Sequence, residues 1–339
     1  MKRLIIPTLV TLLLLACPAA TLEGAKVGMA LWWNSVFPAL LPFFICCGLL
    51  EKLGFTTLFA NRRRIGLLPV FVFGALSGYP SGARLLGGCL KSGVINSREA
   101  QTLSYITNLC SPTFLITIIS FELYQNKRVF LPILLAQTLT VLIFAVFLKI
   151  PTAKNISPSP RIPLADALTD SIMDSMLGLL RVGGCIVFCS VLLSVIFSKI
   201  PIGSPAVKAV VGGIVELTNG CKALVSSGMT LRLQLAFIGF FTSFGGLSIA
   251  LQTLCFLKLE RPLRYIGVKF FMGVVCGIIS YLLTPLFVAD TVVATLSISQ
   301  NYVVNALTVG GILFCSLVGM VFVLLLALIM RRSINTRKC

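Results

Sequence analysis

Long apolar segments, nearly free of charge, follow one another along the whole 339-residue chain. They cover about 4–20, 27–50, 66–90, 101–120, 129–150, 172–198, 205–221, 232–257, 265–288 and 307–330. Most of them have the roughly 20 residues that a helix needs to cross the hydrocarbon core of a bilayer. Charged residues make up only 11 % of the chain, against about 25 % in a soluble domain. We therefore expect an all-α polytopic membrane protein with about 8–10 transmembrane or re-entrant helices.

The charges indicate how the chain is oriented. The net charge is +18, from 28 Lys and Arg against 10 Asp and Glu, which in a soluble protein would point to nucleic acid. In a membrane protein, Lys and Arg instead gather in cytoplasmic loops. With the N-terminus inside, the inside segments carry about twice as many basic residues as the outside loops, as this rule requires. We expect both termini in the cytoplasm and no nucleic-acid partner.

The composition argues against an enzyme. The chain has no histidine, which removes His-based acid–base catalysis and His-ligated metal sites. Its 12 cysteines include no C-x-x-C pair, and most lie in apolar runs, where Cys behaves as a small apolar residue. No G-x-x-x-x-G-K-[ST] nucleotide-binding loop is present. We expect neither an enzyme nor a cofactor.

Prolines divide the chain into two halves. The four prolines within 151–163 cannot all lie in a helix. The sequence predicts an N-terminal membrane helix at 1–24, a first half at 25–150, a Pro-rich linker at 151–170, a second half at 171–330 and a basic cytoplasmic tail at 331–339. Residues 1–20 also resemble a signal peptide, with Lys2 and Arg3 before an apolar run. Because further membrane segments follow, a retained helix is the favoured interpretation.

Glycine and proline interrupt several of the apolar segments. Residues 77–84 read Ser-Gly-Tyr-Pro-Ser-Gly-Ala-Arg, 107–112 contain Asn108 before Ser-Pro, and 242–248 contain a Gly-Gly pair, with Gln252 one turn later. Unwound backbone at membrane depth is tolerated where it is buried in protein or lines a cavity. Many secondary transporters build their solute site from such breaks. The alternatives are a packed kink and a small-residue packing face.

A weak internal repeat accompanies the breaks. The pattern at 74–79 matches 239–244 at an offset of 165, and 48–51 matches 213–216 at the same offset. A further echo relates Ser35 and Leu40 to Ser175 and Leu180 at an offset of 140. Two repeated halves with discontinuous helices would place a site between them.

Ionisable residues inside the apolar segments indicate the charge of the solute. Arg84 follows the first break, Arg181 lies within 172–198, and Glu216 and Lys222 flank Thr218-Asn219-Gly220. Such residues are functional by default, because a charge at membrane depth is costly. Three cations against one carboxylate favour an anion. The alternative is that they extend to the membrane interface or pair with Glu216.

A family resemblance runs over roughly 25–330. It is carried by Leu31 to Phe44 (LWWNSVFPALLPFF), in which Trp32 and Trp33 would anchor the membrane interface, by 77–84, by 108–112, by 180–184, and by 216–222 with 244–252. Together these motifs resemble the YlbJ-type sporulation integral membrane proteins. Where we expect Lys in that family, this chain has Arg84 and Arg181.

The resemblance implies kinship with proteins that carry a nucleoside-recognition, or gate, domain. It implies a role in endospore formation, moving dipicolinic acid, a small aromatic dianion, across the membrane surrounding the forespore. The expected location is therefore the bacterial cell membrane or that forespore membrane. The expected partners are the lipid bilayer, a small anionic solute and a coupling cation, and an oligomer is left open.

The leading hypothesis is a secondary transporter, or permease, of a small organic anion, with carboxylates held by the cations. One alternative is a nucleoside or metal-ion permease of the same fold, in which cysteines 46, 47, 185 and 189 would bind a soft metal. The other is a non-transporting scaffold for sporulation proteins. The expected solute-binding residues are Gly78, Tyr79, Pro80, Ser81, Gly82, Arg84, Asn108, Arg181, Glu216, Thr218, Asn219, Lys222, Ser243, Gly245, Gly246, Ser248 and Gln252.

Overall fold

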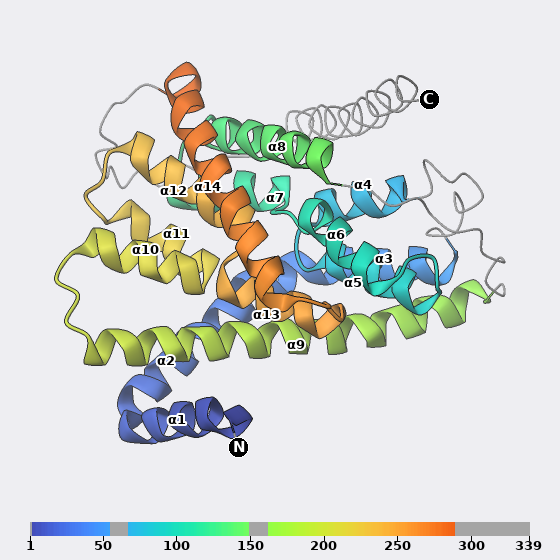
Figure 1. Cartoon of the computed structure of the whole chain (residues 1–339), viewed down its shortest axis with the longest axis horizontal. Helices are drawn as coiled ribbons and strands as arrows, with labels where there is room; N and C mark the ends of the chain where they lie inside the picture. The colour runs from blue at the N-terminus through green and yellow to red at the C-terminus, as the bar shows by residue number, and fades with distance from the viewer. Residues whose placement is uncertain (1, 55–66, 149–161, 289–339) are drawn as a thin grey trace.

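The computed structural model describes residues 2–54, 67–148 and 162–288, and within these ranges every regular element is a helix (Figure 1). The first half contains α1 (Lys2–Ala16), α2 (Pro18–Leu31), the π-helix η1 (Trp32–Val36), α3 (Phe37–Lys52), α4 (Leu68–Ser77), α5 (Ser81–Lys91), α6 (Ser97–Thr107), α7 (Pro112–Phe114), the π-helix η3 (Leu115–Leu123) and α8 (Phe130–Phe147). The second half contains α9 (Leu164–Lys199), α10 (Pro205–Val215), α11 (Leu217–Val225), α12 (Leu231–Phe244), α13 (Gly246–Phe256) and α14 (Pro262–Phe287). The predicted all-α class is confirmed.

Five helical stretches in the described ranges are long and apolar enough to cross a membrane. They are 97–123, 130–147, 164–199, 231–256 and 262–287. A sixth would join α1 to α2 and η1, but the two parts meet at a bend of 101°. Several apolar segments predicted as crossings are therefore not single rods. Segment 66–90, for example, is split into α4 with 10 residues and α5 with 11, and each arm spans about half of a bilayer core.

The segment at 205–221 forms a helical hairpin. Here α10 ends at Val215, Glu216 has extended backbone (φ −138°, ψ 116°), and α11 begins at Leu217. The two arms pack against each other. This arrangement makes the segment the counterpart of the α4–α5 hairpin.

The two halves repeat the same order of elements. Each has a long helix, a two-armed hairpin, a broken helix and a final long helix: α3, α4–α5, α6–η3 and α8, then α9, α10–α11, α12–α13 and α14. In both hairpins a glycine pair brings the arms together. A Cβ built on Gly74 would lie 3.1 Å from the Gly82 Cα, and one on Gly212 would lie 3.6 Å from the Gly220 Cα.

These glycine pairs correct the predicted repeat. Gly212 and Gly220 each follow their counterparts by 138 residues, so the structural offset is close to the echo at 140 and far from 165. The offset of 165 pairs the end of α4 with the end of α12. These helices are not equivalent, because α4 is the first arm of a hairpin and α12 is the first part of a broken helix. Two repeated halves with discontinuous helices are nevertheless present, as predicted.

Local chemistry explains where the helices break. α4 ends at Gly78, whose φ of 74° favours glycine, and Pro80 supplies no N–H to continue the helix. The free Tyr79 N–H donates to the Leu109 carbonyl at the second break (2.8 Å). α12 ends at Gly245, which adopts the left-handed conformation (φ 86°).

At each break, the N-terminus of one helix packs against the C-terminal carbonyl groups of another helix. Gly82, in the first turn of α5, packs against the Thr107 carbonyl at the end of α6. Gly246, the first residue of α13, packs against the last carbonyls of α10; its Cβ position lies 3.0 Å from the Ile214 oxygen. Because a helix N-terminus carries partial positive charge and a C-terminus partial negative charge, these contacts stabilise unwound backbone away from water.

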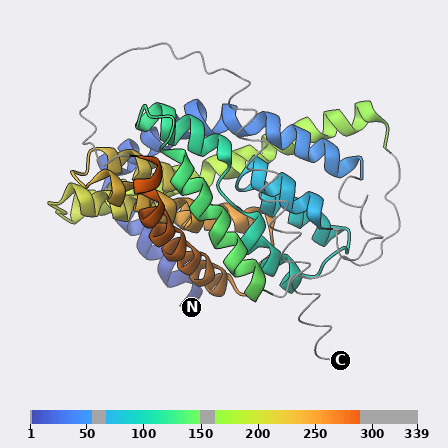
Figure 2. The same ribbon diagram turned by 90° about the horizontal axis from the view of Figure 1, so that it is seen from above.

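Helix α9 is the longest helix in the described ranges. It has 36 residues, follows Pro163 directly, and packs against α2, α3 and α13. Figure 1 shows it running across the lower part of the molecule, above α1, and Figure 2 shows it alongside α3. The predicted linker at 151–170 therefore ends earlier than expected, since 164–170 are helical. Residues 151–161, the segment at 307–330 and the tail at 331–339 lie outside the described residues.

Trp32 does not anchor the membrane interface as predicted. Its ring is buried, and its Nε1–H donates to the Leu179 carbonyl of α9 (3.1 Å). Trp33 is exposed and stacks on Phe37, with ring centroids 5.2 Å apart. Of the two adjacent tryptophans, Trp32 therefore lies in the protein interior, and Trp33 is the one exposed for contact with the membrane interface.

Candidate functional site

The helix breaks surround a cavity of about 100 Å³, here called the central cavity. Both hairpin tips and both broken helices contribute to its wall. Its lining residues are Ser35, Val36, Leu40, Phe43, Ser77, Gly78, Tyr79, Cys110, Ser111, Thr113, Phe114, Thr117, Ile118, Ile186, Glu216, Leu217, Thr218, Ile249 and Gln252. The predicted meeting of breaks around one site is therefore present in the fold.

The wall of the central cavity combines hydroxyl, amide and carboxylate groups with apolar side chains. The Tyr79 hydroxyl donates to the Thr242 carbonyl (3.4 Å), so the first break is joined to the end of α12. The Gln252 Nε2 donates to the Ser248 hydroxyl (3.1 Å), which leaves the Gln252 Oε1 as an acceptor. Among the described residues that line the cavity, Glu216 is the charged one, and none is basic.

Glu216 stands at the tip of the second hairpin. Its Oε2 accepts the Asn219 backbone N–H at 2.7 Å, so the carboxylate caps the N-terminus of α11. The Asn219 side chain in turn donates to the Ser190 hydroxyl of α9 (3.2 Å). The side chain of Glu216 is only 3 % exposed, so this carboxylate is buried at the cavity wall.

A second polar cluster lies behind the break in α6–η3. The Asn108 Nδ2 donates to the Thr253 hydroxyl (2.7 Å) and to the Tyr265 hydroxyl (3.1 Å). The Lys269 Nζ donates to the Asn108 carbonyl (3.0 Å), which is the C-cap of α6. Lys269 is 1 % exposed and was not among the predicted site residues. The signal for it was available, since it is the lone charge in 265–288.

The predicted cations do not gather at the central cavity. Arg84 and Arg181 line a different cavity of about 460 Å³ between α3, α5, α9 and the end of α13. We call it the cationic hollow, because Lys52, Arg84, Lys91 and Arg181 line it together with two acids, Glu51 and Asp174. Lys222 lies in neither cavity and pairs with Glu122 of η3 (3.5 Å).

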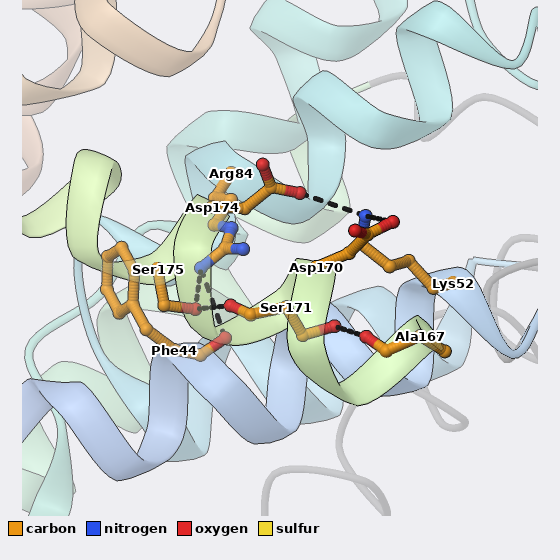
Figure 3. A network of polar contacts seen from close by, with 8 residues as sticks. All are labelled: Phe44, Lys52, Arg84, Ala167, Asp170, Ser171, Asp174 and Ser175. Atoms are coloured by element: carbon orange, nitrogen blue, oxygen red, sulfur yellow. Dashed lines mark hydrogen bonds and ion pairs between the residues drawn. The ribbon is translucent and has the colours of Figure 1, made fainter. Parts of the chain in front are cut away.

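Figure 3 shows how Arg84 is held. Its Nη1 donates to the Phe44 carbonyl (3.1 Å) and to the Ser175 hydroxyl (3.2 Å), and its guanidinium lies 5.0 Å from the centre of the Phe44 ring. Lys52 is already paired with Asp170 (3.3 Å) and Asp174 (3.0 Å). Contacts with α3 and α9 hold Arg84 in the cationic hollow, and the pair with Glu122 holds Lys222 at η3, so the predicted cations do not line the central cavity. Their role in holding the carboxylates of a solute stays a prediction.

Five predicted site residues line the central cavity: Gly78, Tyr79, Glu216, Thr218 and Gln252. Nine others form or adjoin the breaks without lining it: Pro80, Ser81, Gly82, Asn108, Asn219, Ser243, Gly245, Gly246 and Ser248. Sequence reasoning missed the lining hydroxyls of Ser35, Ser77, Ser111, Thr113 and Thr117. Ser111 had a recognisable signal, because it precedes Pro112 and caps the restarted helix (Oγ to the Phe114 N–H, 3.1 Å).

The cysteines proposed for a soft metal are not assembled into a site. Across the described ranges, no group of three or more Cys, Asp or Glu side chains could hold a metal ion. Cys185 instead faces Cys255 of α13, with the two sulfur atoms 3.8 Å apart. The metal-ion alternative therefore receives no support from these residues.

Comparison with known proteins finds a relative among sporulation proteins. No protein-family model matches the chain. No solved structure matches it either. The sporulation integral membrane protein YlbJ of Bacillus subtilis (strain 168) is 27 % identical over 300 residues, covering 73 % of each chain. Together with the apolar helices and the motifs from which the resemblance was predicted, this similarity supports a YlbJ-type family for the chain, a family of sporulation integral membrane proteins.

Proposed function

We propose that the protein is a secondary permease for a small organic anion, with dipicolinic acid as the solute moved during endospore formation. The observation that carries this proposal is the meeting of two hairpin tips and two broken helices at the central cavity. Half-length arms that meet at mid-depth are the usual way in which secondary transporters hold a solute inside the membrane. The proposed location is the membrane surrounding the forespore, with the C-terminus in the cytoplasm.

The size of the central cavity supports a closed conformation in this proposal. At about 100 Å³ it is smaller than the roughly 150 Å³ cavity that holds benzene in an engineered protein. A pyridine ring with two carboxylates needs more room than benzene. The hairpins must therefore part to admit it, and alternating access follows if each hairpin opens the cavity to one side of the membrane.

The cationic hollow would supply the preference for an anion. Its four basic residues exceed its two acids, Glu51 and Asp174, so the hollow keeps an excess of positive charge even though Lys52 pairs with Asp174 and Glu51 lies near Arg84 and Lys91. A carboxylate about 4 Å from an Arg gains on the order of 4 kcal/mol at an effective dielectric of 20. Helix α3 connects the cationic hollow to the central cavity, since Phe43 lines the central cavity and the neighbouring Phe44 carbonyl accepts a hydrogen bond from Arg84.

A neutral solute of the nucleoside class is the second candidate. The observation that favours it is the lining of the central cavity, where hydroxyl and amide groups are present but no described residue is basic. Such groups suit the hydroxyl and base edges of a nucleoside. The two candidates differ in whether the cationic hollow matters for uptake.

Uptake into proteoliposomes tests both candidates. The wild type should take up labelled dipicolinate above empty liposomes, and Ile186→Trp, which fills the central cavity from α9, should abolish uptake. The matched control is Phe188→Trp, because Phe188 is exposed on the same helix and does not line the central cavity. Uptake of nucleosides alone would favour the second candidate. Uptake of neither compound by well-folded protein would contradict both and leave a scaffolding role.

A further inference from the structure

Glu216 is an acid without a cationic partner in the centre of the fold. The three ion pairs among the described residues join Lys52 to Asp170 and Asp174, and Lys222 to Glu122. The buried Lys269 donates to the Asn108 carbonyl and not to Glu216. The Glu216 carboxylate is instead held by neutral groups of its own helix, the backbone N–H of Asn219 and the backbone and hydroxyl groups of Thr218.

The surroundings of Glu216 offer it little other charge. Four ionisable side chains interact electrostatically with Glu216. They are Tyr79 from the first break, Cys189 from α9, and Cys221 and Lys222 from α11. Lys222 points away to Glu122 of η3, the remaining acid that packs near α11. An isolated ionised carboxylate is costly to bury, and in practice such a group takes up a proton.

The position of Glu216 conflicts with an anionic solute unless its charge changes. Its carboxylate lines the central cavity, which any transported solute must occupy in the proposed function. A carboxylate on the wall would repel the carboxylates of dipicolinate, because like charges at close range in a site of low dielectric disfavour each other strongly. Protonation removes this repulsion and leaves an O–H group that can donate to the solute.

We infer that Glu216 carries the proton that this permease moves together with its anionic solute. The proton binds Glu216 Oε1 or Oε2 from the side of higher acidity, the solute then enters the central cavity, and both leave on the other side. Sodium is the competing coupling cation, since the hydroxyl and amide oxygens of the wall are also suitable ligands for Na⁺, and the experiment therefore includes a sodium gradient. This inference rests on the proposed anion permease.

Wild-type protein in liposomes gives the first test. An acidic exterior should drive dipicolinate accumulation by about tenfold per pH unit and per co-transported proton. A pH dye inside the vesicles should report acidification when dipicolinate is added outside. Uptake that ignores the proton gradient, or that follows a sodium gradient instead, would overturn the inference while the permease stands. If the wild type takes up no dipicolinate at all, the proposed function itself fails.

The isosteric variant Glu216→Gln gives the second test. Its amide oxygen can still cap the Asn219 N–H, so the hairpin should remain intact. We expect Glu216→Gln to lose accumulation of dipicolinate by a proton gradient, while exchange of internal for external dipicolinate, which needs no proton release, stays measurable at a changed rate. Glu216→Asp should keep the coupling, and Glu122→Gln is the matched control, because it removes an acid outside the central cavity. Coupling that persists in Glu216→Gln, or exchange that is lost with it in folded protein, would overturn the proton-carrier role.

Discussion

Arg84 and Lys222 occupy equivalent positions in the two hairpins, 138 residues apart, and both point away from the central cavity. Each stands two residues after the glycine at which the hairpin arms meet, Gly82 or Gly220. Their partners differ, however. Arg84 is held in the cationic hollow by the Phe44 carbonyl and Ser175, whereas Lys222 forms an exposed pair with Glu122.

The first prediction separates these two cations. Arg84→Gln should raise the KM for dipicolinate uptake by about tenfold, since the loss of one charge-assisted contact of about 1.4 kcal/mol has that effect. Lys222→Gln should change the KM little, because its side chain is 41 % exposed and such surface pairs contribute about 0–1 kcal/mol. Initial rates over a range of solute concentrations measure both values.

A conservative variant sharpens this comparison. Arg84→Lys keeps the charge but not the two-pronged geometry of the guanidinium, so its KM should fall between those of the wild type and Arg84→Gln. Equal KM values for the wild type, Arg84→Gln and Lys222→Gln would show that the cationic hollow does not recognise the solute.

The second prediction concerns the close approach of the hairpin arms. A Cβ at Gly220 would collide with the Gly213 backbone, so Gly220→Ala should lower the free energy of unfolding by about 1–3 kcal/mol, as overpacking does. The control is Gly267→Ala in α14, where no other atom lies within 4 Å of the added Cβ. That change should be neutral or stabilising by up to about 1 kcal/mol, because Ala favours helix over Gly. Thermal unfolding in detergent micelles measures the difference, and equal midpoints would contradict the hairpin packing.

The positions of the breaks were predictable from the sequence. Pro80 and Pro112 remove backbone donors, and Gly78 and Gly245 adopt positive φ or adjoin such a turn, so each break has a cause within a few residues. Local signals of this kind do not depend on the rest of the fold. The membrane class and the two halves with interrupted helices follow from the same local signals.

The direction of each charged side chain was not predictable in this way. Arg84 lies only four residues after Pro80 of the first break, yet its guanidinium contacts α3 and α9 and not the central cavity. Lys269 lies far along the chain from Asn108 and meets it through the packing of α14 on α6. Both outcomes depend on contacts between distant helices. The repeat offset failed for a related reason, because short glycine patterns occur by chance and the hairpin geometry selects the true pair.

The third prediction tests the support behind the second break. In Lys269→Met the Asn108 carbonyl loses its buried donor, which should lower the free energy of unfolding by about 1–3 kcal/mol. Lys258→Met, at an exposed position after α13, is the control and should stay close to the wild type. Thermal unfolding of the two variants in the same detergent gives the comparison. An unchanged midpoint for Lys269→Met would mean that this hydrogen bond does not hold the break.

The fourth prediction uses the thiols of Cys185 and Cys255, which join α9 to α13 across a sulfur–sulfur distance of 3.8 Å. Copper phenanthroline with oxygen should oxidise them to a disulfide, since a small approach brings the sulfurs to bonding distance of about 2.05 Å. Mass spectrometry should show the loss of two hydrogens in the linked peptides, and Cys255→Ser should prevent it. If α13 moves against α9 during alternating access, the oxidised wild type should lose uptake and regain it with reductant. Full uptake by quantitatively cross-linked protein would show that these two helices move as one body.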